Sequence, residues 1–168
     1  VVENVGIEGD YALQFTYNET SDGWAGATIS KEVSWADCDA LTFWTVPDGK
    51  CQKAVIQITA NGNVYEYYLN LNADYAAVSG TAVQVTIPFA EFVARDIAGN
   101  PAGGLVQDKA DITAFGLWVN AIPGSAAISG NGTVSGTIYY DAITAVNAGL
   151  SEAKVEAAGG KLPPQSST

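Results

Sequence analysis

The stretch Phe115-Gly116-Leu117-Trp118-Val119-Asn120 alternates large apolar residues with a glycine, a tryptophan and an amide. Because successive side chains of a β-strand point to opposite faces, this alternation predicts a strand with one core face. The core face would carry Phe115, Leu117 and Val119. The other face would place the large ring of Trp118 between Gly116 and Asn120. Such a ring is either covered by a loop or belongs to a binding surface.

Period-two alternation and turn signals predict seven further strands around this one. They cover residues 11–17, 24–30, 40–46, 54–59, 64–71, 82–87 and 134–146. Between the fourth and fifth strands of the chain, Asn61-Gly62 predicts a two-residue hairpin turn, because both residues tolerate positive φ. Such a turn fixes the register, so Ile58 is expected opposite Tyr65 and Gln57 opposite Glu66.

Eight strands without a convincing long helix predict an all-β fold, a two-sheet β-sandwich of the jelly-roll type. In a jelly roll the first, eighth, third and sixth strands form one sheet, and the second, seventh, fourth and fifth form the other. We expect a domain at residues 1–147, with a long loop at 94–110. Residues 148–168 are expected to be a linker or tail, because the end is rich in Gly, Pro, Ser and Thr. A short helix can form at 151–158.

The chain has 168 residues, enough for one domain with a core, and a formal net charge of −11. This charge argues against nucleic-acid and anionic-membrane partners and suits a neutral partner or a bound cation. No apolar run is long enough for a membrane helix. The chain opens Val1-Val2-Glu3 without Met, and we expect a monomeric segment of a larger secreted protein.

Histidine is absent from the chain, which excludes catalytic triads and zinc sites built on that residue. Two cysteines, Cys38 and Cys51, flank one predicted strand. A strand of about eight residues is roughly 26 Å long, so its ends are too far apart for one disulfide unless the chain doubles back. The redox state of the two cysteines therefore stays open.

Side chains of one predicted sheet gather into a candidate sugar-binding face. By strand parity this face carries Trp24, Thr28, Gln57, Glu66, Tyr68, Trp118 and Asn120. A pyranose stacks its C–H face on an aromatic ring and offers a rim of hydroxyls to amides and carboxylates, so this mixture suits a glycan. The outer face of the other sheet, which carries Trp44, has fewer aromatic residues and ranks second.

Glu3 and Asp141 form a second candidate site. Glu3 precedes the first strand and Asp141 lies in the last one. Those two strands are neighbours in a jelly roll. Two carboxylates with backbone carbonyls near Lys31 would suit a structural calcium ion. The alternative is that Asp141 accepts backbone N–H bonds or meets Lys31.

Four stretches taken together resemble a known family. They are Asp10–Tyr17, Trp35 with Leu41–Trp44, Thr86–Phe92 and Gly136–Ile143. In this order they resemble the β-jelly-roll carbohydrate-binding modules of bacterial plant-cell-wall-degrading enzymes, above all family 11 and its relatives. The resemblance spans residues ~1–147.

This resemblance implies a non-catalytic module that binds β-1,4 or mixed-linkage glucan or xyloglucan and targets an attached glycoside hydrolase to plant cell-wall polysaccharide, as in cellulosomes. It also implies structural calcium, with Asp141 at the late metal-binding aspartate and Glu3 at the early acidic position. The family's second aspartate is Ala142 here, which puts the detail of that site in doubt.

Two other functions stay open. A jelly-roll glycosidase or lyase would need two carboxylates about 5–10 Å apart across a cleft, and the predicted face offers Glu66 alone. Glu66→Gln would abolish turnover in an enzyme while retaining binding. A cell-surface or scaffold domain would instead use the aromatic face to bind a protein partner.

Overall fold

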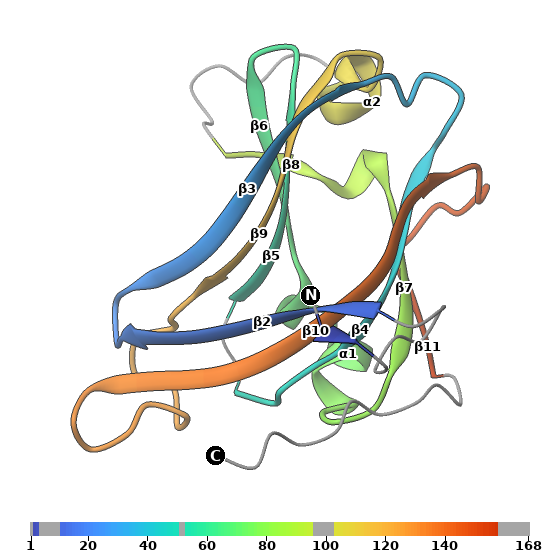
Figure 1. Cartoon of the computed structure of the whole chain (residues 1–168). Helices are drawn as coiled ribbons and strands as arrows, with labels where there is room; N and C mark the ends of the chain where they lie inside the picture. Colours follow the sequence, from blue (N-terminus) through green and yellow to red (C-terminus); the bar gives the residue numbers. More distant parts are fainter. Residues whose placement is uncertain (1, 4–10, 51–52, 96–102, 158–168) are drawn as a thin grey trace.

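The computed structural model describes residues 2–3, 11–50, 53–95 and 103–157, which form two antiparallel β-sheets packed face to face (Figure 1). The first sheet has the order β1-β2-β10-β4-β7-β11. Its strands are β1 (Val2–Glu3), β2 (Tyr11–Thr20), β10 (Thr133–Val146), β4 (Ala40–Val46), β7 (Val83–Pro88) and β11 (Lys154–Ala157). The second sheet has the order β3-β9-β5-β6-β8. Its strands are β3 (Trp24–Val33), β9 (Ile112–Asn120), β5 (Lys53–Ala60), β6 (Asn63–Tyr68) and β8 (Val93–Ala94).

Short helical segments connect some of these strands. They are η1 (Leu69–Leu71), α1 (Ala73–Ala77), η2 (Phe89–Glu91) and α2 (Gly104–Asp108). Within the described part of the chain, no helix has the length and apolar character needed to cross a membrane.

The predicted sandwich and strand order are confirmed, because the four strands expected in each sheet are neighbours in the expected order. The hairpin register is confirmed as well. Asn61 and Gly62 have φ angles of 47° and 76°, and Ile58 pairs with Tyr65 and Gln57 with Glu66. A turn with two positive φ angles matches the twist of the flanking strands, which explains why this short signal sets the register of the hairpin.

Three expectations about the ends and loops differ from the structure. The short helix that the sequence allowed at 151–158 does not form over the described residues, because Lys154–Ala157 forms β11 and pairs with β7. The first sheet therefore extends beyond residue 147, where the sequence predicted a linker. The loop expected at 94–110 contains α2 and follows β8. Residues 158–168 of the expected tail lie outside the described residues.

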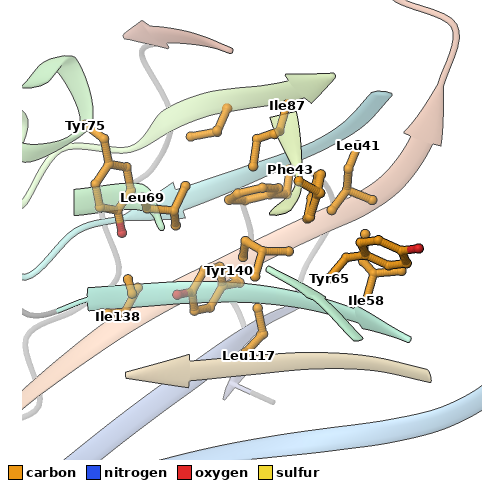
Figure 2. Packing of buried hydrophobic residues seen from close by; sticks show 14 of the residues in the cluster. Leu41, Phe43, Ile58, Tyr65, Leu69, Tyr75, Ile87, Leu117, Ile138 and Tyr140 are labelled. Atoms are coloured by element: carbon orange, nitrogen blue, oxygen red, sulfur yellow. The ribbon is translucent and has the colours of Figure 1, made fainter. Parts of the chain in front are cut away.

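The core lies between the sheets, where the inward residues of both pack together. Figure 2 shows Leu41, Phe43 and Ile87 of the six-stranded sheet facing Ile58, Tyr65 and Leu117 of the other. All but Leu117 are at most 1% exposed, and Leu117 is 5% exposed. This apolar layer fixes which face of each strand points outward, and so it positions every residue of the candidate site.

The two sheets part along one edge. β3 curves away from β2 (Figure 1), and an apolar groove of about 770 Å³ opens between them. Ile29, which the register places on the inner side of β3, is consequently 67% exposed. Period two therefore predicts the face of Ile29 but not its burial, which depends on whether the opposite sheet extends beneath it. Cys38 also lines this groove and has a free thiol, whereas Cys51 lies outside the described residues.

Glu19 is a buried carboxyl on β2 whose two oxygens have no hydrogen-bond partner among the described residues. Burial raises the pKa of Glu19 to about 7. Because this lies above the unfolded value of about 4.3, Glu19 contributes stability that is present below the unfolded pKa and lost as the pH rises through 7. We expect the free energy of unfolding of wild type to fall between about pH 4.5 and pH 8 relative to Glu19→Gln, measured by urea titration. If the free energies of unfolding of the two proteins change in parallel with pH, this expectation is contradicted. The matched control is Glu156→Gln, because Glu156 is exposed.

Candidate functional site

The outward face of the five-stranded sheet is a grid that the strand register defines. Residues that pair across antiparallel strands share a face, so each set of paired residues forms a row across the sheet. The first row is Trp24, Asn120 and Lys53. The second row is Gly26, Trp118, Val55 and Tyr68. The third row is Thr28, Gly116, Gln57, Glu66 and Val93.

Trp118 lies flat on the sheet because its neighbours are glycines. A Cβ added at Gly26, its partner on β3, would overlap Cδ2 and Cε3 of the indole ring. A Cβ added at Gly116 would lie 2.9 Å from Nε1 of the same ring. The ring therefore occupies the space that side chains would take at both positions. A flat ring on a sheet surface offers its outer π-face to a ligand, which is the geometry that sugar stacking requires.

Trp24 and Tyr68 flank Trp118, and we call the three aromatic residues together the platform. Trp24 is 70% exposed and lies diagonally next to Trp118, one row away on β3. Tyr68 lies in the same row as Trp118, two strands away across Val55. Together with Gln57, Glu66, Arg95 and Asn120, these three aromatic residues line a cleft of about 370 Å³, which we call the aromatic cleft.

Glu66 organises the polar side of the aromatic cleft. Gln57 Nε2 donates to Glu66 Oε1 at 2.9 Å, and the Tyr68 hydroxyl donates to Glu66 Oε2 at 2.6 Å. Glu66 is only 7% exposed, so each of its oxygens is engaged in a desolvated environment. Burial, the hydrogen bond to Glu66 and the charge of that residue raise the pKa of Tyr68 to about 12. Glu66 thus fixes the orientation of the Gln57 amide and the Tyr68 ring, and both keep polar atoms for a ligand.

Six of the seven residues predicted from the sequence line this cleft: Trp24, Gln57, Glu66, Tyr68, Trp118 and Asn120. Thr28 lies on the same face in the third row but outside the lining. Arg95 was missed by sequence reasoning. It follows the two-residue strand β8 and reaches the face because its N–H donates to the Val64 carbonyl. The segment around Arg95 has no period-two pattern that would have placed it there.

The glycine beneath Trp118 gives a direct test of the platform. In Gly26→Ala we expect the methyl group to lift the indole ring, because it cannot share space with ring carbons. Glycan affinity should fall by about tenfold, which corresponds to a loss of about 1.4 kcal/mol in binding free energy and is modest for overpacking. The tryptophan fluorescence should change as well. The matched control is Gly130→Ala, because a Cβ at Gly130 has no atom within 4 Å. Equal effects of the two substitutions on glycan affinity would contradict the role of Gly26 in supporting the Trp118 ring.

The proposed metal ligands lie on the other sheet. Glu3 is in β1 and Asp141 is in β10, with β2 between them, and the side chain of Glu3 lies outside the described residues. Asp141 Oδ1 accepts a 2.7 Å hydrogen bond from the Ala142 N–H, at a bulge where Ala142 has a φ of 49°. Among the side chains that the structure describes, no group of three or more His, Cys, Asp or Glu is placed to hold a metal ion. Calcium at Glu3 and Asp141 therefore stays a prediction.

Comparison with known proteins finds the fold among solved structures. One is a family 11 carbohydrate-binding module from Clostridium thermocellum in complex with a β-1,3-1,4-mixed-linked tetrasaccharide. The two chains are 17% identical with a TM-score of 0.51, over 83% of this chain and 86% of the other. Another is the family 11 module of the cellulosomal cellulase Lic26A-Cel5E of the same organism, with the same identity and TM-score and 85% of that chain covered. No family profile and no curated protein sequence matches the chain.

Proposed function

We propose that this chain is a non-catalytic carbohydrate-binding module that binds β-glucan chains in the aromatic cleft. The observation that carries the proposal is the floor of that cleft, where Trp118 lies flat on Gly26 beside the amides of Gln57 and Asn120. A pyranose ring stacks its C–H face on such an indole and bonds its hydroxyls to amides at the edge. Three aromatic residues on one open face would hold successive sugars of an extended chain.

The structural neighbours support the ligand class that we propose. One of the solved modules with this fold is bound to a β-1,3-1,4-mixed-linked tetrasaccharide. This supports mixed-linkage or β-1,4 glucan, with xyloglucan as a substituted form of the same backbone. The other neighbour belongs to a cellulosomal cellulase. We extend the proposal accordingly to a secreted bacterial module that holds a covalently attached glycoside hydrolase on plant cell-wall polysaccharide.

A binding role is favoured over catalysis by the carboxylates of the cleft. Hydrolysis by the usual mechanism needs two carboxyl groups on opposite sides of the scissile bond. Glu66 is the single carboxylate among the described residues that line the cleft, and both its oxygens are held by Gln57 and Tyr68. A carboxylate fixed in this way serves to orient neighbours and is poorly placed to move a proton.

Isothermal titration calorimetry of the chain against a glycan panel tests the proposal. The panel contains mixed-linkage β-glucan, cello-oligosaccharides, xyloglucan and mannan, and incubation with each glycan is followed by an assay for reducing ends. We expect binding to at least one β-glucan without release of reducing ends. No binding to any glycan would overturn the module and favour a protein-interaction domain. Reducing ends that disappear in Glu66→Gln while binding persists would favour the enzyme.

A further inference from the structure

Positive charge gathers on the cleft face of a strongly acidic chain. The whole chain has seven Lys and Arg against eighteen Asp and Glu. A fourth row follows the three described above, and in it Arg95 lies opposite Val64. The charged residues of these four rows are Lys53, Glu66 and Arg95. The local sum of two cations and one carboxylate is +1, whereas the chain as a whole has a net charge of −11.

The two cations lie at opposite ends of the Tyr68–Glu66 pair, Arg95 in the lining of the aromatic cleft and Lys53 beside it. Lys53 is in the first row, and its Nζ lies 5.4 Å from the centroid of the Tyr68 ring. Arg95 is at the far end, and its Nε lies 3.9 Å from Glu66 Oε1. Tyr68 and Glu66 are two residues apart on one strand, a rise of roughly 7 Å. The ammonium and guanidinium groups therefore bracket the Tyr68–Glu66 pair.

The structural contacts of the two cations leave both with capacity for a ligand. The contact of 3.9 Å between Arg95 and Glu66 is longer than a hydrogen bond, and the Arg95 side chain is 66% exposed. Because the guanidinium group is exposed and makes no hydrogen bond to Glu66 at this distance, it keeps donors for a ligand. The oxygens of Glu66 already accept hydrogen bonds from Gln57 and Tyr68. Among the described residues, Lys53 has no carboxylate within 4.0 Å and Arg95 has only Glu66.

We propose that the aromatic cleft recognises a uronic acid residue on an otherwise neutral glycan, with Arg95 binding the carboxylate and Lys53 adding positive charge nearby, while the platform binds the neighbouring sugars. This rests on the proposed carbohydrate-binding function and narrows its ligand class. A guanidinium group offers paired donors that match a carboxylate, and a nearby ammonium adds a point charge. The rest of the glycan must be largely neutral, because a polyanion would meet the acidic surface of the chain beyond the cleft.

Matched pairs of ligands test the carboxylate separately from the sugar chain. One pair is mixed-linkage β-glucan and the same polymer with a small fraction of its C6 hydroxymethyl groups oxidised to carboxylates. The other is glucuronoxylan and its carboxyl-reduced form. Calorimetry with wild type is run at about 20 mM and about 300 mM NaCl, because salt screens exposed charges.

We expect the carboxylated member of at least one pair to bind roughly tenfold more tightly at low salt, since a hydrogen bond to a charged group contributes about that factor. The preference should shrink at high salt. Arg95→Gln and Lys53→Gln should each reduce this preference, measured as the ratio of the affinities for the carboxylated and the neutral member of a pair. Lys154→Gln is the control, because Lys154 lies on β11 of the other sheet and pairs with Glu156.

The outcomes separate the two proposals. Equal or weaker binding of both carboxylated ligands, with a neutral glycan bound, overturns the uronate site and leaves the module intact. A preference for carboxylates that both variants retain also overturns the assignment to Arg95 and Lys53. Binding to neither member of either pair, nor to the neutral glycan panel, overturns both.

Discussion

Trp118→Ala is expected to weaken glycan binding strongly while the protein stays folded. The indole is the centre of the platform, with Trp24 diagonally beside it and Tyr68 in the same row. Its removal would take away the central stacking surface and expose the backbone at Gly26 and Gly116, which the indole now covers. Truncating a central aromatic residue of a binding site typically costs about 2–3 kcal/mol, a loss of roughly 30- to 150-fold in affinity. Calorimetry against the best ligand of the glycan panel measures this loss.

The control for this substitution is Trp44→Ala. Trp44 is also a half-buried tryptophan on a strand, but it lies on β4 of the six-stranded sheet. We expect Trp44→Ala to bind glycan as wild type does, with the melting temperature of both variants compared by calorimetry. If Trp44→Ala loses binding and Trp118→Ala keeps it, the binding face is that of the other sheet. Unchanged binding in both variants would place the ligand outside either platform.

The position of Trp118 was predictable because it depends on local rules that agree with one another. Alternation assigns the face of Trp118, and the Asn61-Gly62 turn sets the pairing that brings Gln57 opposite Glu66. The jelly-roll order then brings β3, β9, β5 and β6 together. Strand parity and pairing allow almost no intermediate cases, since a shift of one residue would move the core face of a whole strand into water.

The cations of the cleft were not predictable by the same rules. Lys53 precedes the strand expected at 54–59, so strand parity assigns it no face, although β5 begins there. Arg95 reaches the face only because β8 pairs with β6 for two residues, which is too short for an alternating pattern. Short edge strands are held by hydrogen bonds to a neighbour and need no periodic apolar sequence of their own. Such strands are visible only once the neighbour is in place.

Burial was the other property that escaped sequence reasoning. Glu19 lies within β2, two residues beyond the strand expected at 11–17, and so the alternation assigns it no inward direction. Asp108 falls within the loop expected at 94–110 and is in fact 4% exposed at the end of α2. A charged residue in a sequence is expected at the surface, and its burial is decided by the elements that pack over it in the fold.

Asp108→Ala is expected to cause the largest loss of stability. The Asp108 carboxylate accepts hydrogen bonds from Asn61 Nδ2 at 3.1 Å, from Asn63 Nδ2 at 3.0 Å and from the buried Tyr65 hydroxyl. It thereby ties α2 to the β5–β6 hairpin. Its loss leaves the buried Tyr65 hydroxyl without this acceptor and removes the bonds from Asn61 and Asn63, so we expect the free energy of unfolding to fall by about 3 kcal/mol. Urea denaturation at pH 7 measures this change.

The pH dependence of wild type and Asp108→Asn separates the charge from the hydrogen-bonding shape. Burial alone would raise the pKa of Asp108, but the hydrogen bonds from Tyr65, Asn61 and Asn63 outweigh it and lower the pKa. Because the folded pKa lies below the unfolded value of about 3.9, the ionised carboxylate stabilises the fold above that pH and loses this contribution as the pH falls. Asp108→Asn should therefore be less stable than wild type at pH 7, and the difference should narrow toward pH 3. A difference that stays constant with pH would mean that the carboxylate acts through its shape alone, and the hairpin would then depend on packing of Tyr65 more than on this charge.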